Sequence, residues 1–551
     1  MSDFAYKMFL TVLLLSFIIV GLLALDYGLP LFVVDDEQSV VLGAMKMLEL
    51  RTVIPSLHQD QFSNILYYPP YFSYLLLPAF ATVVAWQFFT GPFSFYDLSS
   101  FKFFLGLDLS PFFIFARLFS LVAAVFCIIF VVDSSRKLFE SRSAGLFAGI
   151  VIASSLNYMA VSFVARHWIF VTLCLSCVIW LLVNRDIPIN RRYFLSLLVS
   201  AVGSGFSPVC LFGFVISGLW FLVYEGKIGG FSVLVGERPI RGILLLLFFI
   251  FLPLILNLHS NGFTQDVSVA SAKNLLDLLK SPAVFLSMFW QADFSLITLA
   301  IAGCVFGLVR RQKWALIFFV AVILYSFAFY LFFRFENRFF VPMMPILAIY
   351  SAFPVKILFE KFGHVSTAVF LLLMVLPIMS SVKLASLLFL GDARSQSIEW
   401  LQNNINHGVK MVSAARSLKI NSNRDGVIWQ KTLDPLSLRT KERSEYYFNG
   451  NLGHAPFFTS VNLDTVKASS EEVYNFVRKF DPEVIVLDEK GRKTFNSVGL
   501  LRNYIQTKDW GQFSEEEVFS LSKSQFRGWF VDFWVKEYLG PRILIFEKFS
   551  A

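Results

Sequence analysis

Three adjacent acidic residues, Asp35, Asp36 and Glu37, follow directly on the first long apolar segment of the chain. Carboxylates at the boundary of a membrane are costly to place, and those found there often serve a function. A positioned carboxylate can accept the proton of a hydroxyl nucleophile, which is the task of a general base. The alternative is a structural role, in which the acids cap the start of a helix, although one acid is enough for a cap. The triplet is therefore the first candidate for a reactive site.

Aromatic and proline residues follow the acids at positions 67–72, which read Tyr-Tyr-Pro-Pro-Tyr-Phe. Tyrosine rings suit the headgroup level of a membrane, and Tyr68 is a candidate to contact a substrate there. His58, between the acids and this run, is a second such candidate. Asp36, His58 and Asp60 are also residue types that bind divalent metals. A lone histidine on a polar loop is more often a surface residue, so the role of a metal stays open.

Basic residues occupy two other short segments that follow apolar runs. Arg166 and His167 lie in one of them, and Arg334 and Arg338 lie in the other. A guanidinium offers donors in a planar fork that matches the oxygens of a phosphate. These four residues are therefore candidates to bind an anionic headgroup, with Glu336 or Asn337 placed to orient the second pair. Anchoring at the membrane interface is the alternative for both segments.

The elements that position these residues have the composition of a membrane protein. Apolar residues make up 56% of the 551 positions, Phe alone accounts for 65, and only 16% are charged. Such a chain is not one soluble core and indicates several membrane-spanning helices. The five cysteines all fall in apolar runs, which argues against a disulfide framework.

The net charge of +8 is spread over the chain. Residues 391–551 hold 22 Lys and Arg against 20 Asp and Glu, which leaves 25 against 19 for residues 1–390. Basic membrane proteins usually owe such an excess to the loops on their cytoplasmic side. No basic face is concentrated enough to suggest a nucleic-acid partner.

Hydrophobic runs divide residues 1–390 into about eleven predicted spans. The first, Met8 to Leu25, has only Lys7 before it and no small-residue cleavage pattern after it, which is typical of an uncleaved signal anchor. A single broken helix around Ser207 and Pro208 is the alternative to two of the spans. The other spans are expected near residues 112–132, 144–162, 168–183, 193–206, 209–224, 242–258, 294–309, 315–333, 339–355 and 365–388.

The distribution of basic residues predicts the orientation of these spans. With the N-terminus in the cytoplasm, 15 Lys and Arg residues fall in short inside loops and 8 fall outside, in agreement with the positive-inside rule. The acidic triplet then lies in a large external loop over residues 30–111, with an amphipathic surface helix expected at 38–50. A second external loop, residues 259–293, is expected to contain another surface helix. The protein is thus expected in the plasma membrane with its tail outside.

The last part of the chain alternates between helix-like and strand-like stretches. Glu471 to Phe480 has the pattern of a helix, and Val484 to Asp488 has that of a buried strand. Trp529 to Trp534 and Arg542 to Phe546 read as closing strands. The expected fold is therefore an α-helical polytopic membrane protein, residues 1–390, followed by an extracytoplasmic α/β domain, residues 391–551.

Several of these motifs resemble GT-C glycosyltransferases, in the branch of the protein O-mannosyltransferases and the lipid A aminoarabinose transferases. Asp36 to Met47, with the Tyr-Pro-Pro-Tyr run from Tyr68, is similar to their first external loop. Phe115 to Ala148 is similar to their second and third spans. Arg334 to Pro345 resembles the entry into a late span, and Asp392 to Asn404 resembles the opening of their extracytoplasmic domain.

Two positions depart from the family pattern. Asn157 stands where many members have a proline. The turn over residues 163–168 lacks the acidic residue that related enzymes often carry there. This second departure puts in doubt any further carboxylate or metal ligand from that turn.

The resemblance implies an inverting transfer of a sugar from a polyprenyl-phosphate carrier to a lipid, glycan or protein acceptor outside the cytoplasm. Such a step would be mannosyltransferase-like and would belong to glycosylation of the cell envelope. The resemblance assigns the base to Asp36 and a supporting role to Glu37, with Asp35 as the fallback. A flippase or transporter of polyprenyl-linked glycans is one alternative, although no internal repeat supports it. A non-enzymatic assembly partner with the same fold is the other.

Overall fold

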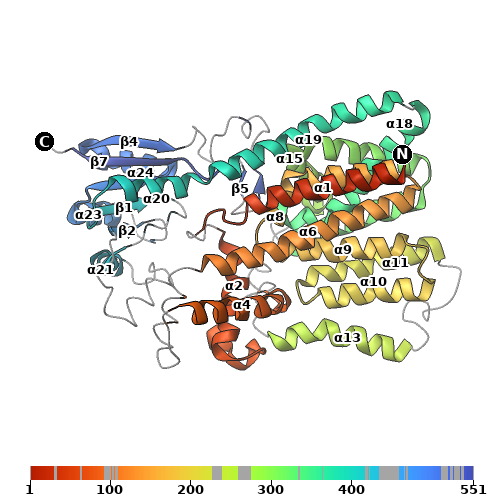
Figure 1. Ribbon diagram of the computed structural model, residues 1–551, viewed down its shortest axis with the longest axis horizontal. Coiled ribbons are helices and arrows are strands. Elements are labelled where there is room, and N and C mark those ends of the chain that lie inside the picture. Colours follow the sequence, from red (N-terminus) through yellow and green to blue (C-terminus); the bar gives the residue numbers. More distant parts are fainter. Residues whose placement is uncertain are drawn as a thin grey trace.

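The computed structural model describes residues 2–29, 34–62, 65–66, 68–91, 101, 105, 109–225, 239–257, 275–332, 336–362, 364–415, 418, 420, 422–433, 458–463, 466, 470–510, 519–520, 525–526, 534 and 539–549. Helices dominate this part of the chain. Figure 1 shows most of them running along the long axis of the molecule, with a small sheet gathered at the end opposite the N-terminus.

The helices of the first 390 residues have the following bounds. They are α1 (Asp3–Leu23), α2 (Asp35–Leu50), η1 (Pro55–His58), α3 (Gln59–Phe62), α4 (Tyr71–Thr90), α6 (Ser110–Phe139), α7 (Arg142–Ala153), α8 (Leu156–Ser162), α9 (Trp168–Val183), α10 (Ile189–Gly203), η2 (Pro208–Leu211), α11 (Phe212–Trp220), η3 (Phe221–Glu225), α13 (Pro239–Leu256), α15 (Leu275–Val309), α16 (Lys313–Phe332), α17 (Asn337–Phe340), η6 (Val341–Met343), α18 (Met344–Phe362) and α19 (His364–Leu390).

The predicted class, an α-helical integral membrane protein, is confirmed. Among the described residues, six helices are long and apolar enough to cross a membrane, judged by length and composition. The bent pair of α7 and α8 and four shorter apolar helices add to these. Many apolar side chains of α1 and α13 remain exposed. Lipid would cover such side chains in a membrane.

The helix α4 is the main difference from the predicted spans, because it lies inside the expected external loop of residues 30–111. It has 20 residues and no charge. Its first residue donates from the Tyr71 N–H to the Gly205 carbonyl, at 3.0 Å. Figure 1 shows α4 displaced toward the sheet end of the molecule, relative to α9, α10 and α11. The predicted loop is thus partly helical, and the aromatic run leads directly into α4.

The expected second external loop, residues 259–293, also differs from its prediction. Residues 275–293 form the first half of α15, which continues to Val309 through a kink at Asp293 (φ −126°, ψ 45°). Residues 258–274 lie outside the described residues. Because the backbone at Asp293 is not helical, two helices meet at this kink, next to the predicted start of the span at residue 294.

The third predicted span, residues 144–162, is a bent pair of helices. α7 and α8 meet at an angle of 67°. Ser155 caps α8 by accepting a hydrogen bond from the Tyr158 N–H at 3.1 Å. A break inside a membrane leaves backbone N–H groups that need new partners.

The C-terminal part contains a five-stranded sheet in the order β2-β1-β3-β7-β4. The strand β1 (Lys410–Ala414) runs parallel to β2 (Thr459–Asn462) and β3 (Val484–Leu487). The strand β7 (Ile543–Lys548) runs antiparallel to β3 and to β4 (Tyr504–Trp510). The described helices of this part are α20 (Ala393–Asn404), α21 (Arg424–Leu433), α23 (Ser470–Phe480), α24 (Glu489–Ser497) and η8 (Leu500–Asn503).

Apolar side chains cover both faces of this sheet. Val484 and Val486 belong to one buried cluster, which includes Leu401 of α20. Ile485 and Leu487 belong to another, which includes Phe480 of α23. Alternate residues of a strand point to opposite faces, so β3 is buried on both sides, as its apolar run predicts.

The predicted elements of the tail mostly appear. The expected helix of residues 471–480 is α23, the expected strand of residues 484–488 is β3, and residues 542–546 fall on β7 apart from the first. The expected strand of residues 529–534 lies outside the described residues except for its last position. A short ribbon of β5 (Phe519–Ser520) and β6 (Gln525–Phe526) brings this part against α8 and α17.

Candidate active site

The helix predicted at residues 38–50 is observed as α2, and its first turn holds Asp36 and Glu37. Val40 on the next turn is buried. The Ser73 hydroxyl of α4 donates to the Val40 carbonyl at 2.9 Å, which ties the two helices together. The side chain of Asp35 lies outside the described residues.

Glu37 is fully buried and forms a two-point ion pair with Arg117 of α6. The Arg117 Nε donates to Glu37 Oε1 at 2.9 Å, and its Nη2 donates to Oε2 at 2.7 Å. The Ala165 N–H donates to Oε1 as well, at 2.5 Å. The other terminal nitrogen of Arg117 donates to the Leu25 and Tyr27 carbonyls, both at 2.8 Å. Glu37 therefore joins the start of α2 to α6 and to the turn before α9, and breaking such a buried pair costs about 3–5 kcal/mol.

Asp36, one residue earlier, faces two guanidinium groups. The Arg338 Nη1 donates to Asp36 Oδ2, and the Arg166 Nη2 lies 3.4 Å from the same oxygen. The Arg166 side chain is 2% exposed, whereas those of Asp36 and Arg338 are 19% and 12% exposed. The carboxylate thus lies between a buried cation and one that a ligand can reach.

A second carboxylate, Glu336, contacts Arg338 from another position. Its Oε2 lies 2.6 Å from the Arg338 Nε. The guanidinium carbon of Arg338 also lies 5.2 Å from the ring centroid of Phe339. Asp36, Glu336, Arg166 and Arg338 are called the charged group below. With all four ionised, its two positive and two negative charges cancel.

His167 is buried beside the charged group and packs against Tyr68, with their ring centroids 4.1 Å apart. Burial lowers the pKa of His167 to about 3; the nearby Asp36 opposes this shift, and Arg338 and Arg166 add to it. The imidazole is therefore neutral near pH 7. The side chain of Asn257, the residue after α13, donates to the Tyr68 carbonyl at 3.0 Å, which fixes this segment.

Asp293, which the sequence interpretation missed, holds the break between α7 and α8. Its carboxylate accepts from the Ser155 hydroxyl at 2.7 Å, the Leu156 N–H at 2.8 Å and the Asn157 side chain at 2.7 Å. The Asn337 side chain donates to Asn157 Oδ1 at 3.0 Å. A proline at position 157 has no side-chain amide to make either bond. The chain of contacts therefore runs from Asp293 to Asn337, the residue before Arg338.

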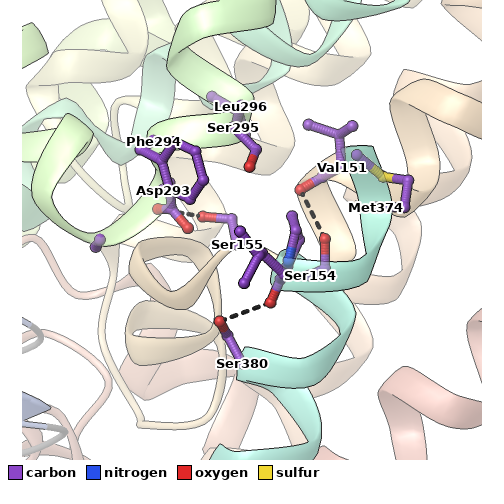
Figure 2. A pocket seen from close by; sticks show the side chains of 12 residues that line it. Val151, Ser154, Ser155, Asp293, Phe294, Ser295, Leu296, Met374 and Ser380 are labelled. Carbon is purple, nitrogen blue, oxygen red and sulfur yellow. Dashed lines mark hydrogen bonds between the residues drawn. The ribbon is translucent and has the colours of Figure 1, made fainter. Parts of the chain in front are cut away.

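A small cavity adjoins this carboxylate. Figure 2 shows the Asp293 side chain directed at Ser155 on the wall of the cavity. Ser154, Ser295 and Ser380 also line it, and its volume is 20 Å³. Such a volume holds about one water molecule. The cavity is too small for a sugar. It lies at the break between α7 and α8, where Ser154 and Ser155 line it.

Among the described residues, two candidates, His58 and Asp60, do not join the charged group. Arg334 lies outside the described residues. His58 ends η1 and is half-buried, and Asp60 on α3 is exposed. Within the described part of the chain, no three His, Cys, Asp or Glu side chains form a cluster that could hold a metal. Two guanidinium groups adjoin Asp36, so a divalent cation does not fit this arrangement of described residues.

Comparison with known proteins gives structural likeness only. No family model matches the sequence, and no curated protein matches it. ArnT from Cupriavidus metallidurans in the apo state is similar over 98% of both chains, with 10% identity and a TM-score of 0.49. The same protein bound to undecaprenyl phosphate is similar over 100% of this chain and 99% of that one, with 10% identity and a TM-score of 0.47.

The apo oligosaccharyltransferase of Archaeoglobus fulgidus is similar over 86% of this chain and 69% of that one, with 12% identity and a TM-score of 0.40. ArnT and the Archaeoglobus fulgidus oligosaccharyltransferase are both GT-C glycosyltransferases, the class that the sequence motifs resemble. Because the TM-scores are below 0.5, a reaction has to be argued from the residues of this chain.

Proposed function

We propose that the chain is an inverting membrane glycosyltransferase that moves a sugar from a polyprenyl-phosphate carrier to an acceptor hydroxyl outside the cytoplasm. The contact of Asp36 with Arg338 and Arg166 is the observation that carries the proposal. Glycosyl transfer from a phosphate-linked donor needs a base for the acceptor and cations for the departing phosphate. The charged group offers both within one cluster of contacts.

Binding of the donor would begin with its phosphate. A polyprenyl-phosphate sugar is a phosphodiester with one negative charge, and its oxygens suit the guanidinium fork of Arg338. Arg338 is the more accessible of the two arginines, and one of its terminal nitrogens is held by Asp36. The phosphate would compete with Asp36 for this guanidinium. Asp36 would then be released beside the bound donor as a free carboxylate.

The transfer step balances the charges. The acceptor oxygen bonds to the anomeric carbon while the bond from that carbon to the phosphate oxygen breaks. The acceptor proton passes to Asp36, and the electron pair of the broken bond stays on the phosphate beside Arg166 and Arg338. Asp36 loses one negative charge as the phosphate gains one, so the net charge of the cluster is unchanged. Attack opposite to the leaving phosphate inverts the configuration of the sugar.

His167 and Tyr68 would complete the donor site. A neutral imidazole adds no positive charge that would repel Arg166 and Arg338, and it retains one N–H donor. The contact between the rings of His167 and Tyr68 orients both side chains. The side chains of His167 and Tyr68 would direct the donor phosphate toward Arg166 and Arg338.

The proposal is tested by incubating the purified protein with polyprenyl-phosphate sugars that carry a radiolabelled sugar. Release of carrier phosphate together with a labelled acceptor product is expected for at least one donor. A panel that includes mannose and aminoarabinose donors would identify the sugar. A folded protein that consumes none of them would contradict the proposal.

A transporter of the lipid-linked sugar is the second candidate, because the described chain has a broken helix pair beside a buried aspartate, Asp293. Broken helices and buried ionisable residues are common at the sites of transporters. Proteoliposomes separate the two candidates. A transferase cleaves the bond between sugar and phosphate, whereas a transporter moves the intact donor to the other leaflet.

A further inference from the structure

A second cavity, with a volume of 510 Å³, lies far from the charged group. Lys137 and Leu138 at the end of α6 line it, as do Leu182 and Val183 at the end of α9. The charged group adjoins the opposite ends of these helices. The 16 residues of α9 alone extend over about 24 Å. The volume is in the range of small-ligand pockets, about 300–1,000 Å³.

The wall of this cavity carries both signs of charge. Its basic residues are Lys137, Arg185 and Arg192, and its acidic residues are Glu140, Asp186 and Glu225. Lys137 is already well paired, because its Nζ lies 2.7 Å from Asp186 Oδ2 and 2.5 Å from Asn184 Oδ1. The two arginines are less well satisfied.

Arg192 is the residue that points to a ligand. It is 7% exposed, and its Nε has no hydrogen-bond acceptor among the described residues. Its only ion pair in that part of the chain is a long one, with 3.3 Å between its Nη2 and Glu225 Oε1. The ring of Tyr193 lies 5.6 Å from the guanidinium carbon. A buried donor without an acceptor is costly, and a ligand oxygen in the cavity would remove that cost.

Arg185 and two aromatic residues extend this wall. Arg185 is exposed and forms no ion pair with any residue in the described ranges. The rings of Trp220 and Tyr224 stack with their centroids 4.8 Å apart, and Lys313 Nζ lies 5.5 Å from the Tyr224 ring. Trp and Tyr are typical of the headgroup level. The charge distribution of the loops predicts that this end faces the cytoplasm.

We propose that this cavity is a binding site for a phosphate ester, held by Arg192 and Arg185. Guanidinium groups bind phosphate oxygens through two parallel hydrogen bonds, and Arg192 Nε supplies an unused donor. The ligand is either the headgroup of an anionic lipid or a soluble phosphate compound, which share this chemistry. The site is independent of the proposed transfer reaction, because it has no residue in common with the charged group.

The test uses the full-length protein in nanodiscs of phosphatidylcholine. Phosphatidylglycerol is introduced in one arm and inorganic phosphate in the other, and binding is followed by native mass spectrometry and by the midpoint of thermal unfolding. Arg192→Gln and the exposed Arg185→Gln are compared with Arg310→Gln, an exposed arginine at the junction of α15 and α16. Loss of the phosphate contact is expected to weaken binding about tenfold in each cavity variant.

One supporting result is that phosphatidylglycerol binds more tightly than inorganic phosphate, that the cavity variants weaken this binding, and that Arg310→Gln leaves it unchanged. This result would assign the site to a lipid. Binding of inorganic phosphate with the same dependence on Arg192 and Arg185, but none of phosphatidylglycerol, would support a soluble ligand. Failure of both probes, or equal weakening in Arg310→Gln, would overturn the proposal. Because Arg185 is exposed, its variant keeps the test valid if Arg192→Gln fails to fold. Donor consumption should be unchanged in the Arg192 and Arg185 variants, so failure of this proposal would leave the proposed transfer reaction standing.

Discussion

Asp36 and Glu37 are neighbours in sequence but lie in different environments. Both oxygens of Glu37 are used by Arg117 and by the Ala165 N–H, inside the protein. Asp36 has contacts that an anionic ligand can replace, and part of its side chain is exposed. A base has to release its partner before it can accept a proton. Asp36 meets this condition better than Glu37.

The accessible arginine of the charged group should control use of the donor. Arg338→Ala removes the guanidinium that contacts Asp36 and Glu336, and we expect the KM for the lipid-linked donor to rise about tenfold or more. Lys280→Ala is the matched control, because Lys280 is an exposed cation near the start of α15. Equal effects of the two variants in a steady-state assay would reduce Arg338 to an interface anchor.

His167 should make the stability of the protein sensitive to acid. The pKa of His167 is about 3 in the folded protein and about 6.5 in an unfolded chain. Between these values the unfolded state binds more protons, so stability is complete above about pH 6.5 and falls as the pH drops toward 3. The midpoint of thermal unfolding should therefore fall between about pH 7 and pH 5, and fall less in His167→Gln. Parallel curves for both proteins would contradict the assignment.

Three of the candidates that the sequence indicates lie together in the described chain: Asp36, Arg166 and Arg338. Each is a charged residue beside an apolar run. That signal needs no knowledge of the fold. Asp293 carries the same signal, one acid between apolar runs, but it lies one residue before the predicted span, where an acid at a loop end attracts no notice. The pairing of Glu37 with Arg117 joins residues 80 positions apart. Local spacing cannot predict such a contact.

At the scale of elements, the broken pair of α7 and α8 depends on a carboxylate from another helix. Asp293→Ala would leave the Ser155 hydroxyl and the Leu156 N–H without this acceptor. We expect a loss of stability of about 3 kcal/mol or more, because each buried donor left unpaired costs about 1–3 kcal/mol. Chemical denaturation of the purified protein measures the loss. Asp277→Ala, an exposed acid on the same helix, should change stability little, and similar losses in both would refute the role of Asp293.

Hydrophobic runs predicted most helices but not how they are joined. The apolar sequence from Tyr71 to Thr90 forms α4, although it was expected within a loop. The sequence from Leu275 to Val309 forms two helices that meet at a kink at Asp293, and the first of them is longer than the predicted surface helix. A hydrophobic run shows that a segment is apolar. It does not show where the segment bends or what it contacts, because these depend on residues from distant parts of the chain.

At the scale of the whole molecule, the arrangement of charges predicts which end faces outward. The charged group and the sheet lie toward one end, where Arg394 at the start of α20 donates to the Tyr27 hydroxyl at 3.2 Å. The cavity lined by Arg192 lies at the other end of α9 and α6. The alternation of helix and strand patterns was enough to predict an α/β tail. The contact of that tail with Tyr27, in the turn after α1, was not predictable, because it joins side chains that are distant in the sequence.

The orientation can be tested by labelling introduced cysteines in intact cells with a membrane-impermeant thiol reagent. Asn403 at the end of α20 and Asn190 at the start of α10 are both exposed, so access of the reagent does not depend on unfolding. We expect labelling of Asn403→Cys and none of Asn190→Cys until the cells are opened. Both variants are made in a protein whose five native cysteines have been replaced, so that only the introduced cysteine can be labelled. The reverse pattern would invert the molecule and move the charged group to the cytoplasm.

The proposed reaction depends on Asp36 taking the acceptor proton. Asp36→Asn keeps the size of the side chain and removes the base, so donor consumption should fall about 10²–10⁴-fold, the range typical of general bases. The assay compares equal amounts of folded, membrane-inserted protein, with Asp60→Asn as an exposed control and Asp35→Asn as the alternative base. We expect near-normal turnover in both of these variants. Near-normal turnover in Asp36→Asn would contradict the account, and its loss in Asp35→Asn alone would move the base by one residue.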